Sequence, residues 1–449
     1  MAGEWKETTL GAEVDLLTGF PFKSEHYTDA ADSIRLVRGD NIVQGAMRWD
    51  GVKKWPSSET AEHELFQLRE GDLVLAMDRP WIEAGLKYAA ISKYDLPCLL
   101  VQRTARLRGG TKLDTGFLRY LIGSREFTQH IHAITTGTAV PHISGRQIKD
   151  FCFALPPLAE QKAIAAVLGA LDDKIELNRR MNATLEAMAR ALFQSWFVDF
   201  DPVRAKLDGC QPIGIDPATA ALFPSTFHES EAGHIPKGWI VKPVGEVVDC
   251  VGGGTPSTAE PKYWKGGKHH WTTPKDFSSL QAPVLLDTNR KITDVGIAKI
   301  SSGLLPAGTL LLSSRAPVGY LAIAAMPVAI NQGFIAMRCN ERASNFFMLN
   351  WCQANMTEIE SRATGTTFAE ISKQNFRPIP VVLPPKELMA AFTSKVAPLY
   401  AQITANLQQS RTLATLRDTL LPKLLSGELS VAGATCKPDG HVQPGAAKP

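Results

Sequence analysis

Two stretches of this chain repeat each other without a gap, and this duplication constrains the fold more than any other feature. The segment TTGTAVPHISGRQIKDFCFALPP begins at Thr135, and ATGTTFAEISKQNFRPIPVVLPP begins at Ala363. Matching residues such as Ile143 and Ile371 are separated by a constant spacing (371 − 143 = 228). A constant spacing over such a span indicates an internal duplication, so the chain is predicted to contain two copies of one structural unit.

Each repeated segment is followed by a heptad pattern, in which steps of four and three residues alternate. That spacing keeps one stripe of a helix facing a partner helix. The first seam consists of Ile164, Leu168, Leu171, Ile175, Asn178, Asn182, Leu185, Ala189, Leu192 and Trp196. It spans about 48 Å at ~1.5 Å per residue. At the 228-residue spacing the seam returns as Phe392, Val396, Leu399, Ile403, Asn406, Ser410, Leu413, Arg417, Leu420 and Leu424.

Both seams are polar at their centre. An amphipathic helix lying on a globular core is the commoner structure for such a pattern. Two copies of equal length, each polar in the middle, favour mutual pairing instead, because polar seam residues cost stability but fix register. We therefore expect Asn182 near Asn406 and Asn178 near Ser410 in an antiparallel pair.

Two residues are expected to weaken the second helix. Pro398 lacks a backbone donor and predicts a kink. Arg417 places a charge on the seam near one end of the helix. We expect the start of this helix to be bent or interrupted, but not absent.

The regions before the helices, 5–155 and 238–385, have the pattern of β-rich domains. Short apolar runs such as GDLVLAMD and GTLLLSS are separated by Gly, Pro, Asn and Asp, and short helices are expected at 116–133 and 344–360. The predicted fold class is α+β, with two mixed domains in tandem repeat and each followed by a long helix. The predicted boundaries are 1–157, helix 158–198, linker 199–237, 238–385, helix 386–427 and a disordered tail at 428–449.

Composition excludes several classes of protein. The chain is 44% hydrophobic and 21% charged, as in ordinary globular proteins, and its net charge of +3 is too small to indicate nucleic-acid binding by itself. It has no apolar run of about 18 residues, which a membrane span requires. The N-terminal sequence has no signal-peptide core, and the seven cysteines are scattered without a CxxC pair. A cytoplasmic protein with reduced cysteines is expected.

Motifs that carry chemistry are missing from the sequence. There is no GxxxxGK[ST] loop for ATP, and VGGGTPST at 251–258 is predicted to be a turn. AMDRP and LSSRAP do not make a nuclease carboxylate cluster, and HIH and KHHW lack further metal ligands at a suitable spacing. The chain is therefore predicted to recognise a ligand and not to catalyse a reaction.

Candidate binding residues lie in both β-rich domains. In 238–385, basic residues cluster around Tyr263, Trp264 and Trp271; alternatively, the tryptophans belong to the core and the lysines are merely solvated. These basic residues are Lys262, Lys265, Lys268, His269, His270 and Lys275. In 5–155, the candidates are Arg79, Trp81, Lys87, Arg103, Arg106 and Arg108. The last three could instead form the solvated face of a strand, and the doubled Thr-Gly-Thr could contact phosphate or form a turn.

The sequence resembles the specificity subunit of a type I restriction–modification system over nearly its whole length. The residues that carry the resemblance are TAVPHIS…LPPLAEQKAIAAVL, SWFVDFDPVRAK, GIDPATAALFP, IPKGW and GGGTPSTAEPKYWKGGKHHW. The resemblance implies two target-recognition domains joined to an antiparallel coiled-coil spacer. Each domain would read one half of a bipartite site on double-stranded DNA.

The resemblance also implies partners. Two modification subunits would use S-adenosylmethionine to methylate adenine, and two restriction subunits would add ATP- and Mg-dependent translocation and cleavage. The chain itself would bind no cofactor. The second junction, LPPKELMAAF, lacks the Glu-Gln of LPPLAEQ, which leaves open whether the two halves bind their partners equally well.

Three alternatives stay open. One is a fused enzyme, against which the missing motifs argue. Another is a scaffold whose paired helices only organise methyltransferase subunits. The third is the specificity module of a system that methylates without cleaving.

Overall fold

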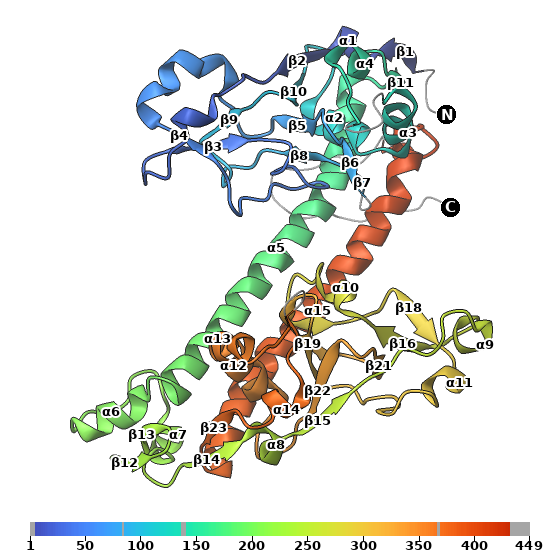
Figure 1. Cartoon of the computed structure of the whole chain (residues 1–449). Helices are drawn as coiled ribbons and strands as arrows, with labels where there is room; N and C mark the ends of the chain where they lie inside the picture. The colour runs from blue at the N-terminus through green and yellow to red at the C-terminus, as the bar shows by residue number, and fades with distance from the viewer. Residues whose placement is uncertain (1–4, 83–84, 136–140, 366–368, 432–449) are drawn as a thin grey trace, which may run out of the picture. The chain divides into compact units, whose positions relative to one another are not determined.

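The computed structural model describes residues 5–82, 85–135, 141–365 and 369–431 (Figure 1). The chain divides into two compact units, which we call unit 1 (1–174 with 413–449) and unit 2 (175–412). Each unit combines one β-rich domain with one end of each long helix. We call the β-rich part of unit 1 domain 1 and that of unit 2 domain 2.

Domain 1 contains a four-stranded sheet of order β2-β10-β5-β8 and a three-stranded sheet of order β4-β3-β9. A separate antiparallel pair, β1-β11, places the start of the domain beside its last strand. The strands are β1 (Lys6–Thr9), β2 (Val14–Thr18), β3 (Ile34–Val37), β4 (Lys54–Trp55), β5 (Leu73–Ala76), β6 (Trp81–Ile82), β7 (Gly85–Leu86), β8 (Tyr88–Ala90), β9 (Cys98–Leu100), β10 (Thr104–Gly109) and β11 (Cys152–Leu155). The helices are α1 (Leu10–Glu13), α2 (Thr115–Ile122), α3 (Arg125–Ile134) and α4 (Gly145–Lys149), with 3-10 turns at Ser24–His26 and Ser57–Phe66.

Domain 2 repeats this topology with one additional edge strand, β17. Its sheets have the orders β15-β22-β19-β20-β17 and β18-β16-β21, and β14 pairs with β23. The strands are β14 (Ile240–Pro243), β15 (Asp249–Gly252), β16 (His269–Thr272), β17 (Val284–Leu285), β18 (Arg290–Ile292), β19 (Leu310–Ser314), β20 (Val318–Ala324), β21 (Val328–Ile330), β22 (Phe334–Arg338) and β23 (Pro380–Leu383). The helices are α8 (Val244–Val247), α9 (Pro261–Trp264), α10 (Pro274–Phe277), α11 (Asp294–Ile297), α12 (Asn345–Ala354), α13 (Met356–Ser361) and α14 (Lys373–Phe376).

The duplication therefore runs through the whole of both domains. One close backbone approach shows the correspondence. A Cβ added at Gly19 would lie 2.1 Å from the carbonyl oxygen of Val101, and one added at Gly253 would lie 2.0 Å from that of Ile330. Only glycine fits either position, because the backbone passes directly against the end of β9 or β21.

Two 40-residue helices, α5 (Leu158–Phe197) and α15 (Lys386–Leu425), follow the β-rich domains. In unit 1, Arg417 Nη1 donates to Asp172 Oδ1 at 2.8 Å. In unit 2, Asn406 Nδ2 donates to Asn182 Oδ1 at 2.9 Å. Positions rise along α5 while their partners fall along α15, so the pairing is antiparallel.

The second polar layer lies where the seam predicts it. Asn178 Nδ2 is 3.2 Å from Ser410 Oγ and 2.9 Å from Gln409 Oε1. Asn178, Asn182 and Asn406 are all nearly inaccessible to solvent. Buried amides of this kind favour the register in which they are paired.

The predicted interruption of the second helix is wrong. The α15 helix is continuous through Pro398, because Val396, Tyr400 and Ile403 on either side are buried in the core of unit 2. Packing of a buried face can hold a helix where propensity alone would break it. The charge of Arg417 is balanced by Asp172 of α5, which lies next to the seam residue Leu171 in the sequence.

Two further expectations need correction. The single helix expected at 116–133 is two helices, because the Ser124 side chain caps α3 by accepting a hydrogen bond from Phe127 N. The one expected at 344–360 likewise breaks at Asn355. The linker at 199–237 contains α6 (Asp201–Leu207), α7 (Pro217–Ala221) and a hairpin of β12 (Phe227–Ser230) and β13 (Gly233–Pro236).

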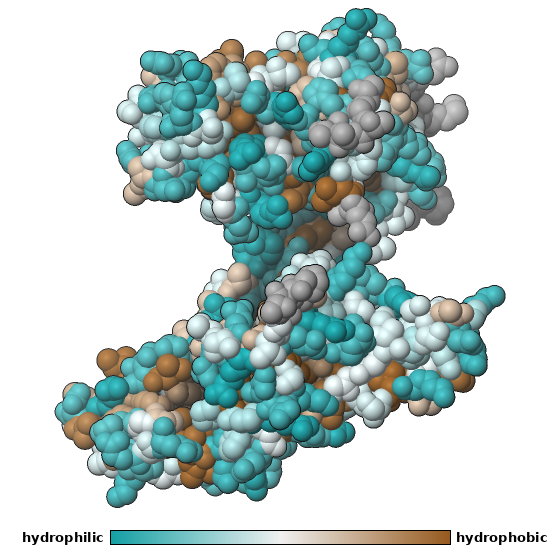
Figure 2. All heavy atoms as spheres, viewed as in Figure 1, coloured by the Kyte–Doolittle hydropathy of each residue, from teal (hydrophilic) through white to brown (hydrophobic). Residues whose placement is uncertain are grey.

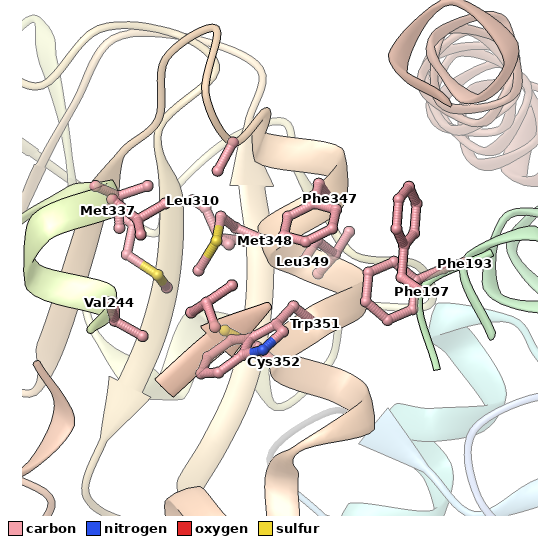
Figure 3. Close-up of a cluster of buried hydrophobic side chains, with 14 of the residues drawn as sticks. Phe193, Phe197, Val244, Leu310, Met337, Phe347, Met348, Leu349, Trp351 and Cys352 are labelled. Atoms are coloured by element: carbon pink, nitrogen blue, oxygen red, sulfur yellow. The ribbon is translucent and has the colours of Figure 1, made fainter. Parts of the chain in front are cut away.

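The core of unit 2 joins α5 to domain 2 through aromatic contacts. Phe193 and Phe197 of α5 lie beside Phe347 of α12 (Figure 3), and Leu310 and Met337 of the sheet belong to the same core on the opposite side of that helix. Hydrophobic residues also reach the surface around α6 and the β12–β13 hairpin (Figure 2), where Val198, Leu207 and Ile213 are exposed. No helix in the described part of the chain is long and apolar enough to cross a membrane.

Candidate nucleic-acid interface

A basic cavity of about 390 Å³ lies at the strand ends of domain 1. The parallel strands β3 and β9 end side by side, so the residues that follow them meet at one edge of the sheet. Arg38 follows β3, Gln102 and Arg103 follow β9, and Arg79 follows β5. The complete lining is Tyr27, Arg38, Gly39, Asp40, Asp78, Arg79, Lys87, Val101, Gln102 and Arg103.

Two of these arginines have left-handed backbone conformations. Arg79 has φ 45° and Arg103 has φ 64°. Hydrogen bonds hold both turns, from Arg79 N to Pro141 O at 2.7 Å and from Met77 N to Arg103 O at 2.9 Å. Because non-glycine residues pay about 1–3 kcal/mol for such a conformation, these positions are candidates for a functional role.

The charges in this cavity are only partly balanced. Arg103 Nη1 and His142 Nδ1 each lie 2.5 Å from an oxygen of Asp78. Burial works to raise the pKa of Asp78, but these two hydrogen bonds outweigh it and the pKa is lowered. Burial lowers the pKa of Lys87. Asp40 acts to raise this pKa, whereas the positive charges of Arg48 and Arg79 lower it further. Crowded positive charge of this kind suits a polyanion such as DNA.

Domain 2 has a cavity of about 440 Å³ at the equivalent place. Aligning the strand registers matches Asp78 with Arg315, Arg79 with Ala316, and Lys87 with Tyr320. Ala316 has φ 58°, so the left-handed turn is kept although the side chain is not. The complete lining is Thr273, Pro274, Lys275, Ser278, Arg315, Ala316, Tyr320 and Asn331. The two cavities thus share a backbone and differ in their side chains.

The repeated segment is tied to each cavity in the same way. Ile143 N donates to Met77 O, and Ile371 N donates to Ser314 O, each at 2.9 Å. Next to these bonds each repeated segment forms a β-bridge, Asp78 with His142 in domain 1 and Arg315 with Glu370 in domain 2. The acidic and basic positions are exchanged between the two bridges, and the Arg315–Glu370 ion pair is 3.6 Å long. The segment therefore anchors the mouth of each cavity to the chain that leads into the long helix.

The Thr-Gly-Thr motif is only partly described. Thr136, Gly137 and Thr138 lie outside the described residues, as does Thr366. Thr364 exchanges two backbone hydrogen bonds with Glu370, each at 2.9 Å.

The structure separates the predicted contacts of domain 2. Lys275 follows β16 and lines the cavity, whereas His269 begins the same strand and lies 2.7 Å from Asp294. Lys265 and Lys268 are exposed between α9 and β16, and Lys262 lies 3.4 Å from Glu260. These residues lie at or before the start of β16, and Lys275 lies beyond its end; the four-residue strand is about 13 Å long at ~3.3 Å per residue.

His270 and the two tryptophans contact other residues of unit 2. His270 Nδ1 is 3.2 Å from Asp287 Oδ1, a carboxylate that also pairs with Lys291 and with Arg411 of α15. Burial and Lys291 lower the pKa of His270. Trp271 is buried, as the core alternative predicts, whereas Trp264 is half-buried, with the Arg290 guanidinium 3.8 Å from its ring.

In domain 1 the structure brings Arg79, Lys87 and Arg103 into the cavity but not Arg106. Arg106 lies on β10, is 4% exposed and pairs with Asp15, so it is not available to DNA in this structure. Arg108 pairs with the buried Asp72. These two arginines do not form a solvated strand face, because their charges are neutralised within the sheets.

Several polar residues of the cavities were missed from the sequence, among them Arg38, Arg315 and Asn331. A signal was present in AMDRP and LSSRAP, which place an arginine within two residues of a proline after corresponding strands. In the described part of the chain, no group of three His, Cys, Asp or Glu residues could hold a metal.

Internal packing explains the glutamine in the junction difference between the repeats. Gln161 is fully buried, accepts a hydrogen bond from Asp114 N at 2.8 Å and donates to Pro156 O at 2.8 Å. At the 228-residue spacing Met389 takes its place and is equally buried. Gln161 thus holds α5 to domain 1, and its absence from the second junction is not evidence of a weaker partner site.

A family model, individual relatives and solved structures all match this chain to the same kind of protein. The family model described as "Type I restriction modification DNA specificity domain" matches residues 27–187 and 236–409. Each match runs through one β-rich domain and into the helix that follows it.

Individual relatives agree with the family match. The HindI specificity subunit of Haemophilus influenzae is 28% identical over 357 residues, which cover 70% of this chain and 77% of the relative. The EcoAI specificity subunit of Escherichia coli is 38% identical over 170 residues, 37% of this chain and 28% of the relative. The S subunit of a type I system from M. genitalium has a TM-score of 0.52 at 16% identity, covering 94% of this chain and 96% of that one, which shows a shared fold.

Proposed function

The chain belongs to the family of type I restriction–modification DNA specificity subunits, and from this premise we propose that each β-rich domain reads one half of a bipartite DNA site. One observation carries the proposal. The two domains have the same topology and hold equivalent cavities at the same strand ends, but they line them with different side chains. A constant backbone with variable lining is what two separate sequence readers on one scaffold require.

The chemistry of the linings supports DNA as the ligand. Arg79, Arg103 and Lys87 in domain 1 can bind phosphate or the acceptor edge of guanine, and Lys275, Arg315 and Asn331 in domain 2 add an amide suited to adenine. Lys265 and Lys268 remain candidates for phosphate contacts outside the cavity.

We further propose that two modification subunits bind the ends of the helix pair. Each unit holds one end of α5 and one of α15, so one chain offers two similar docking surfaces. The partners would supply S-adenosylmethionine-dependent adenine methylation, and restriction subunits would supply ATP- and Mg-dependent cleavage, while this chain contributes recognition only. Mass measurement of the assembled complex should show two modification subunits per chain; saturation at one would contradict this arrangement.

The recognition role is tested by sequencing modified adenines in the source genome with and without this gene. The expected result is loss of one motif made of two short parts separated by a fixed gap. Loss of a continuous motif would contradict the bipartite reading, and no change in adenine methylation would contradict the role itself. Loss of methylation without any associated cleavage would instead favour a system that only modifies DNA.

A further inference from the structure

Three polar side chains meet at the mouth of the domain 1 cavity. Arg103 Nη1 lies 2.5 Å from Asp78 Oδ2, and His142 Nδ1 lies 2.5 Å from Asp78 Oδ1. Asp78 follows β5, Arg103 lies between β9 and β10, and His142 belongs to the repeated segment before α4. We call these three residues the Asp78 cluster. It joins three parts of domain 1 that are distant in the sequence.

Asp78 is held in place through both its backbone and its side chain. A β-bridge joins it to His142, and Ile143 N donates to Met77 O beside it. Each carboxylate oxygen has one of the two partners, and the side chain is 21% exposed. Burial acts to raise the pKa of Asp78, but the hydrogen bonds from Arg103 and His142 lower it overall. Asp78 is therefore a fixed negative charge at neutral pH.

Arg103 is oriented by this carboxylate but keeps donors for a ligand. Its hydrogen bond to Asp78 uses Nη1, and its side chain is 68% exposed. Arg108 differs, because its Nε and Nη2 both donate to Asp72. A guanidinium carries five N–H donors in one plane. One bond to a fixed carboxylate therefore limits the direction of that plane and leaves other N–H groups of Arg103 accessible.

The backbone at Arg103 does not require an arginine. Its φ of 64° is left-handed, a conformation that glycine adopts without strain. Met77 N donates to Arg103 O at 2.9 Å. Ser314 N donates in the same way to Gly333 O at 2.8 Å, so the equivalent residue of domain 2 is a glycine. An arginine in a strained, exposed turn indicates a function for its side chain.

The Asp78 cluster differs between the two domains at every member. The strand registers match Asp78 with Arg315. The 228-residue spacing matches His142 with Glu370. Arg315 and Glu370 form an ion pair of their own at 3.6 Å, and Gly333 adds no third side chain to it. The three positions thus change together on one framework, as residues that act as a unit in recognition would.

We propose that Arg103 reads a guanine in the half-site of domain 1 and that Asp78, held by His142, is the positioning residue that orients its guanidinium. This inference rests on the proposed function, which makes DNA the ligand of the cavity. Guanine presents its O6 and N7 acceptors side by side in the major groove, and an arginine that binds both must hold its plane in one orientation. Contacts to phosphate carry no sequence information and need no such restraint.

The test measures binding of the complex, assembled with modification subunits, to a duplex that carries its motif, by fluorescence anisotropy. Each guanine of the motif is replaced in turn by 7-deazaguanine, which lacks the N7 acceptor but keeps Watson–Crick pairing. One such replacement should weaken binding of the parent about tenfold. In Arg103→Ala the same replacement should change the affinity less than about twofold, because the donor to N7 is gone.

Asp78→Ala tests the positioning role. The penalty for 7-deazaguanine at that position should shrink from about tenfold to about threefold or less, because the arginine is no longer held toward the base. A purely structural role would weaken both duplexes equally and leave the penalty unchanged. The matched control is Asp40→Ala, which removes another carboxylate of the same cavity, 3.3 Å from Arg38, and should keep the full penalty.

His142→Ala gives an independent reading if Asp78→Ala does not fold. It leaves the carboxylate in place but removes its second partner, and it should also reduce the penalty. An unchanged penalty in the folded Asp78 or His142 variants would overturn the proposal. So would a motif in which no guanine is sensitive to 7-deazaguanine, or an Arg103→Ala complex that binds every duplex more weakly by the same factor. A parent complex that does not bind its own motif would instead contradict the proposed function, and that result is read before any variant is made.

Discussion

Arg79 meets two requirements that a single substitution can separate. Its backbone holds a left-handed turn that Ala316 reproduces in domain 2, and its side chain adds positive charge to the cavity of domain 1. The turn belongs to the shared scaffold, whereas we propose that the charge serves recognition by one domain.

Arg79→Gly keeps the turn and removes the guanidinium. The free energy of unfolding should stay within about 1 kcal/mol of the parent, because glycine adopts positive φ without strain. DNA binding by the assembled complex should weaken by about 1–3 kcal/mol. The control is Arg69→Ala, an exposed arginine of domain 1 outside the cavity. Equal loss of affinity in both variants would show that the cavity is not the contact surface.

The buried cysteines make stability depend on pH. Burial raises the pKa of Cys98 to about 12 and of Cys250 to about 11, and raises that of Cys352 as well. An unfolded thiol ionises near pH 8.5, so above that pH the unfolded state releases protons that the folded state retains. This contribution is present below about pH 8.5 and is lost as pH rises toward the folded pKa values.

Urea unfolding at about pH 8 and about pH 10 checks this expectation. The midpoint should fall at the higher pH, and it should fall less in Cys98→Ala. An identical decrease in the parent and the variant would assign the effect to other groups.

At the scale of the element, the helix pair depends on its polar layers. Asn406→Leu leaves the 3%-exposed Asn182 without its 2.9 Å donor and should lower the free energy of unfolding by about 1–3 kcal/mol. Adding Asn182→Leu should recover most of that loss, since an apolar layer has no orphaned group, but should loosen the register. A thermal unfolding series on the parent, both single variants and the double variant measures the coupling. Strictly additive losses would mean that the two amides do not interact.

Much of the helix pair was predictable from the sequence, and much of the β-rich domains was not. The seams, their polar centres and the Pro-Pro corners follow one fixed spacing, so Asn182 and Asn406 could be matched from their numbers. The strands carry no such spacing: β5 and β19 are offset by 310 − 73 = 237 residues, and β10 and β22 by 334 − 104 = 230. Loops of unequal length hide the common topology, and with it the equivalence of Arg79 and Ala316.

Local rules also failed where tertiary packing decides the outcome. Pro398 does not break α15, because its neighbours are buried. Arg106 looked like a surface residue from strand alternation, yet Asp15 from the adjacent strand neutralises it inside the sheet. Lys275 lines the cavity and His270 does not, although only five positions separate them. His270 lies near the start of β16, whereas Lys275 lies in α10, beyond the end of that strand.

At the scale of the whole molecule, the chain contains two copies of one structural unit, a β-rich domain followed by a long helix. The repeated segments fix the cavity mouth to that helix through Ile143 and Ile371, so the lining can change without changing the framework. This arrangement predicts that recognition is modular. The first domain should specify one half-site and the second domain the other.

The most direct test replaces domain 1 with that of a relative, joined within Leu155-Pro156-Pro157 just before α5. The methylated-adenine motif of cells carrying the hybrid is then determined by sequencing modified bases. The account predicts that one half of the motif changes while the other half and the gap between them stay as in the parent. A hybrid that changes both halves, or that leaves the parental motif intact, would contradict the claim that each domain reads its own half-site.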